Sequence, residues 1–359
     1  MKIGFDARMI THPGIGRYIK GLIPELIRQA PRDEFVIFGD PQHLTCIPKK
    51  DNVTVIKWTA SVYSLSEQFP PYDKYGLDIL HIPHFNIPVF CKTKMVVTIH
   101  DLIYLLLPEA ASSPIAKFYA KFMIGQSLNK AHKIISISQN TKDDIVSVFG
   151  SKNADKIEVI PEAAVDKFKV IEDKDRIRGM SDKYGLSDKV ILYVGSIKRH
   201  KNVGTLIEVY NILKKKGISH QLVITGRWDK KEDDLRKSIN DKDIRYIGEI
   251  PTEDLMLLYN HADILLHLSM YEGFGLTTLE AMRCGTPVVT SGTSSLPEVC
   301  GDAALYVNPL DIGQIVDTVY NVVSNSNIKK GLIERGFEQA NRFSWEKTAG
   351  RTLETYHKA

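Results

Sequence analysis

Cysteine is scarce in this chain of 359 residues, and no long apolar run is present. The four cysteines are too widely spaced for a zinc site or a disulfide framework, at Cys46, Cys91, Cys284 and Cys300. They are therefore expected to be reduced thiols of a cytosolic protein. The most apolar stretch, 95–107, is interrupted by His100 and Asp101, so no membrane-spanning helix is predicted.

A large excess of charge of one sign is missing as well. Lys and Arg number 47 and Asp and Glu 43, which gives a net charge of +4, and the basic residues are scattered along the chain. This pattern argues against a nucleic-acid partner, while it fits a diphosphate ligand or an anionic membrane surface. A signal peptide is not expected, because the chain leads directly from Met1 into a strand-like run.

Short β-branched runs alternate with amphipathic helical stretches. Strands are predicted at 2–6, 34–38, 53–58, 78–82, 95–99, 133–137, 157–160, 190–194, 221–225, 244–247, 263–268, 287–290 and 304–307. Helices are predicted between them, among others at 16–29, 203–216, 253–261 and 312–323. Such alternation is typical of parallel sheets with right-handed crossovers. The length favours two domains, and the charged stretch 166–183 predicts their division into 1–168 and 169–344.

One segment carries the most chemical information. Glu272 and Glu280 bracket a Gly-Phe-Gly turn and the start of an apolar helix, directly after the predicted strand 263–268. Glycines at such a junction let backbone N–H groups approach a ligand, and the positive end of the helix favours an anion. Two carboxylates beside this turn suit a ligand with hydroxyls next to phosphates, such as a nucleotide sugar.

The same segment resembles the signature of the retaining family 4 glycosyltransferases, which have the GT-B fold. The likeness lies in the Glu-x7-Glu spacing, in Gly-Phe-Gly after the first Glu, and in Leu-Glu-Ala-Met at the second. Stretches 285–291 and 294–302 are similar to the continuation of that family's donor region. The resemblance implies an α/β protein with two Rossmann-like domains facing a cleft. Residues 345–359 are then expected to return as a helix to the first, acceptor-side domain.

The resemblance also implies roles for the two carboxylates. Glu280 matches the position that binds the ribose hydroxyls, and Glu272 matches the one that contacts the transferred sugar; a surface carboxylate is the plainer interpretation of Glu280. Backbone groups of the turn are the expected partners of sugar hydroxyls and phosphate oxygens, at Phe274, Gly275, Leu276 and Thr277.

The loop after strand 190–194 is the predicted diphosphate site. Lys201 matches the family's Lys that grips the diphosphate, and Arg199 is the candidate for its Arg, although His200 stands directly before Lys201. Ser196 occupies the position after Gly195 where many members carry Arg, and it is predicted to line the donor. From composition alone, this turn would be a solvated basic loop. Gly226 and Glu249, which end the next two strands, are predicted to lie near the base.

Two positions in the first half are further candidates. The turn Pro-Gly-Ile-Gly-Arg-Tyr lacks the third glycine of a dinucleotide fingerprint, because Ile19 stands there; Gly16 is predicted to allow close approach of a donor. His100 with Asp101 follows strand 95–99 and resembles the family's motif at the reacting sugar, where an imidazole can donate to a hydroxyl. The alternative is that Asp101 caps a helix and backbone satisfies His100.

No metal and no cofactor are predicted. The pairs Asp173-Lys-Asp175 and Asp241-Lys-Asp243 have the Asp-x-Asp form of metal-dependent transferases, but neither follows a clear apolar strand, so both are interpreted as solvated turns. The helix predicted at 115–131 mixes lysines with aromatic residues. It could rest on an anionic membrane, although packing on the first sheet is the favoured interpretation.

The predicted activity is retaining transfer of a hexose from a nucleoside diphosphate to a glycan or lipid-linked acceptor. The pattern most resembles bacterial mannosyltransferases of surface polysaccharide assembly, which implies GDP-mannose as donor, with a UDP-hexose as the alternative. A GT-B epimerase or phosphorylase and a non-catalytic sugar-nucleotide binder are further alternatives. A dehydrogenase is disfavoured by the incomplete glycine pattern. The expected location is the cytoplasm, with peripheral contact to the inner membrane face left open.

Overall fold

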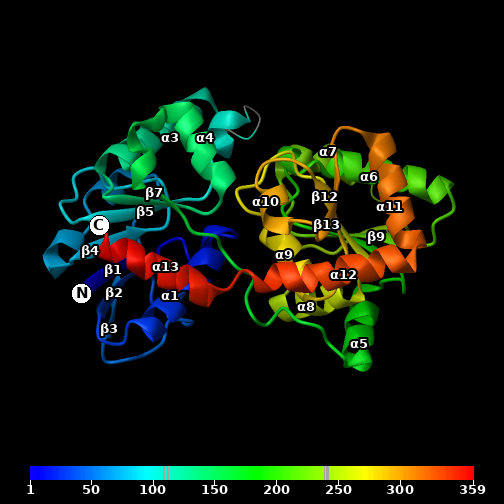
Figure 1. Ribbon diagram of the computed structural model, residues 1–359, viewed down its shortest axis with the longest axis horizontal. Coiled ribbons are helices and arrows are strands. Elements are labelled where there is room, and N and C mark those ends of the chain that lie inside the picture. Colours follow the sequence, from blue (N-terminus) through cyan, green and yellow to red (C-terminus); the bar gives the residue numbers. More distant parts are fainter. Residues whose placement is uncertain (108–109, 111–112, 238, 240–241) are drawn as a thin grey trace. The chain divides into compact units, whose positions relative to one another are not determined.

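The computed structural model describes residues 1–107, 110, 113–237, 239 and 242–359. The chain forms two compact units, one of residues 1–163 with 344–359 and one of residues 164–343 (Figure 1). Each is an α/β unit built on one parallel sheet. The sequence placed the division slightly later, at 168 and 169. Among the described residues, no helix combines the length and apolar character needed to cross a membrane.

Unit 1 contains a seven-stranded sheet in the order β3-β2-β1-β4-β5-β6-β7, with every pairing parallel. Its strands are β1 (Lys2–Asp6), β2 (Glu34–Gly39), β3 (Val53–Lys57), β4 (Ile79–Ile82), β5 (Met95–Ile99), β6 (Lys133–Ser136) and β7 (Ile157–Val159). Its helices are α1 (Ile15–Gln29), α2 (Ile103–Leu106), α3 (Pro114–Lys130), α4 (Gln139–Phe149) and α13 (Trp345–His357). Short 3-10 turns lie at Leu65–Gln68, Tyr72–Tyr75 and Ser151–Lys156.

The last helix belongs to unit 1, as the sequence resemblance implied. Figure 1 shows α13 running beside α1. The ring of Trp345 lies against Gly21 of α1, where a Cβ atom would come within 2.1 Å of it. Gln29 donates to the carbonyl of Glu346, and Tyr356 bonds to buried His81 of β4. These contacts attach the C-terminal end of the chain to the first sheet.

Unit 2 contains a six-stranded parallel sheet in the order β10-β9-β8-β11-β12-β13. Its strands are β8 (Val190–Val194), β9 (Gln221–Thr225), β10 (Ile244–Tyr246), β11 (Ile264–His267), β12 (Val288–Ser291) and β13 (Ala304–Val307). Its helices are α5 (Lys174–Tyr184), α6 (Val203–Lys215), α7 (Asp233–Arg236), α8 (Thr252–His261), α9 (Leu276–Arg283), α10 (Leu296–Cys300), α11 (Ile312–Ser324) and α12 (Ser326–Asn341), with 3-10 turns at Arg199–Lys201 and Lys230–Glu232.

Side-chain alternation along the strands divides the core of unit 2 between the two faces of its sheet. Ile191 and Tyr193 of β8 pack in one cluster with residues of α6 and α11, while the intervening Leu192 is also fully buried. A sheet buried on both faces explains why its strands have continuous apolar sequences. The thirteen strands found among the described residues lie where the sequence predicted them, within one or two residues.

The strand orders decide where ligands can bind. In each sheet the order reverses beside the first strand, between β1 and β4 in unit 1 and between β8 and β11 in unit 2. In open α/β sheets, ligands bind beyond the carboxyl ends of the strands at such a reversal. The loops that follow β8 and β11 are therefore the expected ligand site of unit 2.

Candidate active site

The loops after β8 and β11 meet in unit 2. The backbone N–H of Met270 donates to the carbonyl of His200 at 2.8 Å, and Nζ of Lys201 lies 2.5 Å from Oε1 of Glu272. The sequence predicted both Lys201 and Glu272, and the structure brings them together as an ion pair. Both side chains are largely buried, with 17% and 13% of their surface exposed.

Two further side chains converge on the same carboxylate oxygen. Nε2 of His267 lies 2.8 Å and Oγ of Ser269 lies 2.7 Å from Oε1 of Glu272. Burial would raise the pKa of Glu272, but the charge of Lys201 and the hydrogen bond from His267 hold it well below its usual range. Glu272 is therefore a carboxylate at any physiological pH.

Two serines hold the Gly-Phe-Gly turn in place. Oγ of Ser294 accepts from the N–H of Glu272, and Oγ of Ser295 donates to the carbonyls of Glu272 and Phe274. Gly275 then takes φ = 106°, a conformation that favours glycine, and forms the N-terminal cap of α9 without a side-chain acceptor. The start of α9 therefore has no side-chain acceptor for its first N–H groups at the cap position, and an anion-binding role for this helix end stays a prediction.

The other residues of the loop after β8 differ in exposure and in their hydrogen-bond partners. Arg199 shares the 3-10 turn of Lys201, but its side chain is exposed and forms no ion pair within the described residues. Burial lowers the pKa of His200 to about 4, so this residue does not replace the family's Arg as a cation. The carbonyl of Ser196 accepts from Tyr193.

The two residues predicted to lie near the nucleobase of the donor, Gly226 and Glu249, differ in exposure. Gly226 packs against the backbone of Gly195, with its N–H bonded to the carbonyl of Gly248. Glu249 is exposed. Neither observation identifies a base.

Glu280 lies inside unit 2. Only 2% of the residue is exposed, and Oε2 accepts a hydrogen bond of 3.1 Å from the hydroxyl of Tyr259. A surface carboxylate, the plainer interpretation from the sequence, is therefore wrong for this position. In the turn itself Phe274 is buried, while Leu276 and Thr277 are partly exposed at the first turn of α9.

In unit 1, His100 lies at the carboxyl end of β5. Its Nδ1 is 2.9 Å from Oε1 of Glu162, and its Nε2 is 3.1 Å from the carbonyl of Pro83. Because the carbonyl can only accept, Nε2 carries a hydrogen, and one further proton must lie between Nδ1 and Glu162. Oδ1 of Asp101 accepts from the N–H of Ile103, the first residue of α2, although the N-cap position of that helix is Leu102. The backbone partner that the alternative gave to His100 is therefore present, together with a buried carboxylate, while Asp101 stands one residue before the cap.

Gly16 has a structural explanation in the fold. A Cβ atom there would lie 2.3 Å from the carbonyl oxygen of Ile10, and the N–H of Gly16 bonds to the carbonyl of His12. The close approach predicted for this glycine is thus made by the backbone of its own loop.

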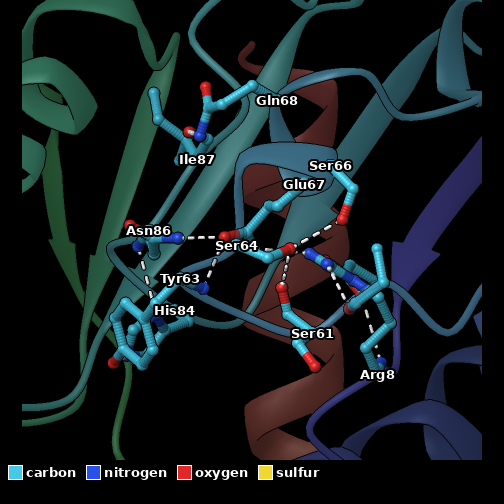
Figure 2. Close-up of polar contacts among 12 residues, drawn as sticks. Arg8, Ser61, Tyr63, Ser64, Ser66, Glu67, Gln68, His84, Asn86 and Ile87 are labelled. Atoms are coloured by element: carbon cyan, nitrogen blue, oxygen red, sulfur yellow. Dashed lines mark hydrogen bonds and ion pairs between the residues drawn. The ribbon is translucent and has the colours of Figure 1, made fainter.

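A buried ionic cluster lies at the reversal point of unit 1. The guanidinium of Arg8 pairs with Asp6 at 2.7 Å and with Glu67 at 2.8 Å, and donates to the carbonyl of Ala60. Figure 2 shows Arg8 and Asn86 approaching Glu67 from opposite sides. The adjoining cavity holds about 10 Å³, enough for roughly one water molecule, and the contacts of Arg8 with Ala60 and Glu67 secure the loop 60–67.

Two protein-family descriptions match the chain. Glycosyltransferase Family 4 matches residues 14–164, and Glycosyl transferases group 1 matches residues 174–339. This chain belongs to the family 4 glycosyltransferases.

Curated relatives and solved structures agree with this assignment. The glycosyltransferase is 29% identical to O-antigen chain mannosyltransferase B of Escherichia coli, over 99% of both chains. It is 28% identical to the serotype-specific mannosyltransferase WbdA of Escherichia coli, over 77% of its own length and 34% of that protein. Its fold is similar to that of Anabaena Alr3699/HepE in complex with UDP and glucose, with a TM-score of 0.79 and 18% identity over 100% of both chains. The fold is GT-B.

Several site residues of this glycosyltransferase were not predicted. In the sequence, His267 cannot be told from a core residue of a buried strand, and Ser269 cannot be told from an ordinary residue after the end of a strand. Glu162 follows the last strand of unit 1 and is 62 residues from His100. Ser294 lay in a segment matched to the family, but its positive φ of 50° and its bond to Glu272 require coordinates.

The first of the two Asp-x-Asp pairs lies at the start of a helix. Asp173 is the N-terminal cap of α5, accepting from the N–H of Arg176, and Asp175 lies in the first turn of that helix. Both aspartates are exposed to solvent, as expected, but they lie at the start of a helix and not in a turn, and helix α5 occupies much of the expected linker. In the second pair, Asp241 lies outside the described residues.

Proposed function

We propose that this protein is a retaining mannosyltransferase that uses GDP-mannose and needs no metal ion. It would transfer mannose to a hydroxyl of a glycan or lipid-linked acceptor and keep the α-configuration. The observation that carries the proposal is the largely buried Lys201–Glu272 pair at the strand reversal of unit 2, which is followed in the same loop by the partly exposed start of α9. Both Escherichia coli relatives are mannosyltransferases, which favours mannose.

The chemistry follows from the charges in unit 2. The ammonium of Lys201 supplies fixed positive charge for the departing diphosphate in a place with little water, where such charge is most effective. The N–H groups at the start of α9 would add to it. Glu272 would contact the transferred sugar and keep Lys201 in place.

Retention is proposed to proceed on one face of the sugar. A carboxylate that already accepts from Lys201, His267 and Ser269 is a weak nucleophile, because its charge is stabilised before the reaction begins. A covalent glycosyl intermediate on Glu272 is therefore disfavoured. The leaving phosphate itself would then take the proton of the acceptor hydroxyl.

Unit 1 is proposed to hold the acceptor side of the reaction. His100, with the proton that it shares with Glu162, would donate to a hydroxyl of the reacting sugar. Because both ring nitrogens have partners within unit 1, such donation requires the bond to Pro83 or to Glu162 to be exchanged.

Helix α3 supports a peripheral membrane contact. It packs on the sheet through Ala120, Met123 and Ile124 among others. On other positions it exposes apolar side chains that a water-facing helix rarely carries, at Ile115 (81% exposed), Phe118 (75%) and Phe122 (52%). With Lys117 and Lys121 between them, we propose that this surface rests on the anionic cytoplasmic face of a membrane that bears the acceptor.

That membrane contact has a direct test. The protein should co-sediment with vesicles that contain anionic lipid and should not do so with purely zwitterionic ones. Replacement of Phe118 and Phe122 by Ser should abolish co-sedimentation while the thermal transition is retained. Equal co-sedimentation of the variant and the parent would remove the proposal.

The donor is tested by thermal shift with GDP-mannose, UDP-glucose and ADP-glucose. A ligand at a hundredfold excess over its dissociation constant stabilises the native state by about 2.7 kcal/mol. Selective stabilisation by GDP-mannose supports the proposal, and selective stabilisation by UDP-glucose assigns a UDP-hexose donor in its place. No shift with any sugar nucleotide contradicts a donor site.

The reaction is tested by NMR of the product. An α-linked mannoside formed from GDP-mannose in the presence of EDTA supports retention without metal. An inverted linkage, or loss of activity that a divalent cation restores, contradicts the corresponding part of the proposal. A changed donor without acceptor would indicate an epimerase, and binding without turnover a non-catalytic protein.

A further inference from the structure

His267 and Ser269 form a polar cluster with Glu272 and Lys201 that the family resemblance does not assign. His267 ends β11, and its backbone is fixed by pairing with Thr290 of β12, whose hydroxyl also donates to the His267 carbonyl. Its ring lies parallel to that of Tyr193, with centroids 6.2 Å apart. The imidazole is thus buried and rigidly placed, with 2% of the residue exposed.

The hydrogen-bond partners decide which tautomer this imidazole adopts. Nε2 faces an oxygen of the Glu272 carboxylate at 2.8 Å, which can only accept, so Nε2 carries the hydrogen. Nδ1 is buried and has no hydrogen-bond partner among the described residues. A second proton on Nδ1 would therefore be an unsatisfied buried donor. The partners thus place the hydrogen of the ring on Nε2, which donates to Glu272.

Ser269 completes the arrangement. Its hydroxyl donates to Oε1 of Glu272 at 2.7 Å, and its oxygen lies 3.1 Å from Nε2 of His267. The His267 N–H is therefore shared between the carboxylate and the serine oxygen. With Lys201, three donors from two loops end on one oxygen atom.

This geometry defines how the ion pair keeps its orientation. The terminal torsion of a Glu side chain is broad, so a carboxylate held by Lys201 alone could rotate. His267 at the end of β11 and Ser269 just after it hold Oε1 of Glu272 in one position, so Lys201 must reach that position to form the ion pair.

We infer that His267 and Ser269 are positioning residues of the transferase, which hold the Glu272 carboxylate so that Lys201 is placed for the diphosphate of the donor. The inference rests on the proposed function only for its consequence in turnover. The tautomer and the orientation are properties of the protein without any ligand.

Replacement of His267 by Leu removes the donor, and replacement by Gln keeps an N–H near the position of Nε2. Loss of a hydrogen bond to a charged group lowers kcat/KM by about tenfold or more in His267→Leu, while His267→Gln should recover most of it. Ser269→Ala should show a smaller loss of the same kind. His220→Leu is the matched control, because His220 is also buried but precedes β9 at the opposite end of the sheet.

The pH profile separates positioning from a merely structural role. The bond from His267 helps to keep the pKa of Glu272 low. In His267→Leu that pKa rises, so activity should be lost at a higher pH on the acid limb. In His267→Gln and His220→Leu the acid limb should stay where it is in the parent. A His267→Leu variant with the kcat/KM of the parent, or a His267→Gln variant that recovers none of the loss, overturns the inference.

A second readout needs no substrate. Nitrogen-15 NMR of the ligand-free protein should show His267 with a hydrogen on Nε2. An Nδ1–H tautomer without a hydrogen on Nε2 overturns the inference even if the protein transfers sugar normally. Conversely, a parent protein that binds no sugar nucleotide refutes the proposed function and leaves the NMR result to decide this one.

Discussion

Replacement of Arg8 by Met tests the best-defined buried charge cluster in unit 1. Arg8 is almost fully buried, with 4% of its side chain exposed, and Asp6 and Glu67 are similarly buried at 6% and 1%. Its guanidinium donates to both carboxylates and to the carbonyl of Ala60. Figure 2 shows Arg8 beside Glu67. Methionine has a similar length but no charge, so it leaves two buried carboxylates without their cation.

The expected loss of stability is large. Removing one partner of a buried ion pair costs about 3–5 kcal/mol, because the remaining charge is left uncompensated. For a unit of roughly 180 residues, each kcal/mol lowers the melting temperature by about 2–4 °C. The melting temperature of unit 1 should therefore fall by about 6–20 °C at pH 7.

The loss should depend on pH with a definite sign. Burial raises the pKa of Glu67 in the native protein, against the lowering effect of Arg8. Without Arg8 that pKa rises further above its unfolded value. A carboxyl of this kind stabilises the fold below its unfolded pKa, and the stabilisation is lost as pH rises through the folded pKa. The deficit of Arg8→Met should thus shrink between pH 7 and pH 4.

Differential scanning calorimetry from pH 4 to pH 8 measures both effects. Arg28→Met is the control, since Arg28 forms its ion pairs on the surface of the same unit and its loss should leave the transition unchanged. A variant as stable as the parent at pH 7, or a deficit that grows on acidification, would refute the reasoning about buried charge.

Three other predictions concern activity. Lys201→Ala should lower kcat by about 100-fold or more while circular dichroism shows a retained fold, and unchanged turnover would remove Lys201 from the diphosphate site. Glu162→Gln should lower kcat by about tenfold with the KM for donor unchanged, because His100 loses the shared proton; full activity would show that this pair is structural. Dialysis against EDTA should leave steady-state rates unchanged, and a rate restored only by added divalent cation would contradict metal-independent transfer.

The sequence could predict the parts of the site that belong to local motifs, but not the contacts between residues far apart in the chain. Lys201 and Glu272 stood out because each belongs to a local motif, a basic turn after a strand and a Gly-Phe-Gly turn before a helix. Their contact could not be predicted from the sequence, because they are 71 residues apart. The strand order places β8 beside β11, and only then do the two loops meet.

Local patterns determined the alternation of strands and helices in this protein, and with it the parallel α/β class. β-branched runs between turn residues specify strands, and the thirteen strands depend on little else. Motif resemblance determined the family. The tertiary structure alone decided that His267 and Ser269 contact Glu272, that Glu162 lies beside His100, and that Arg8 reaches Glu67. Each of these contacts is between polar groups whose burial and direction depend on how the strands are ordered. A side chain's neighbours along the chain say nothing about which acceptor it meets across a sheet.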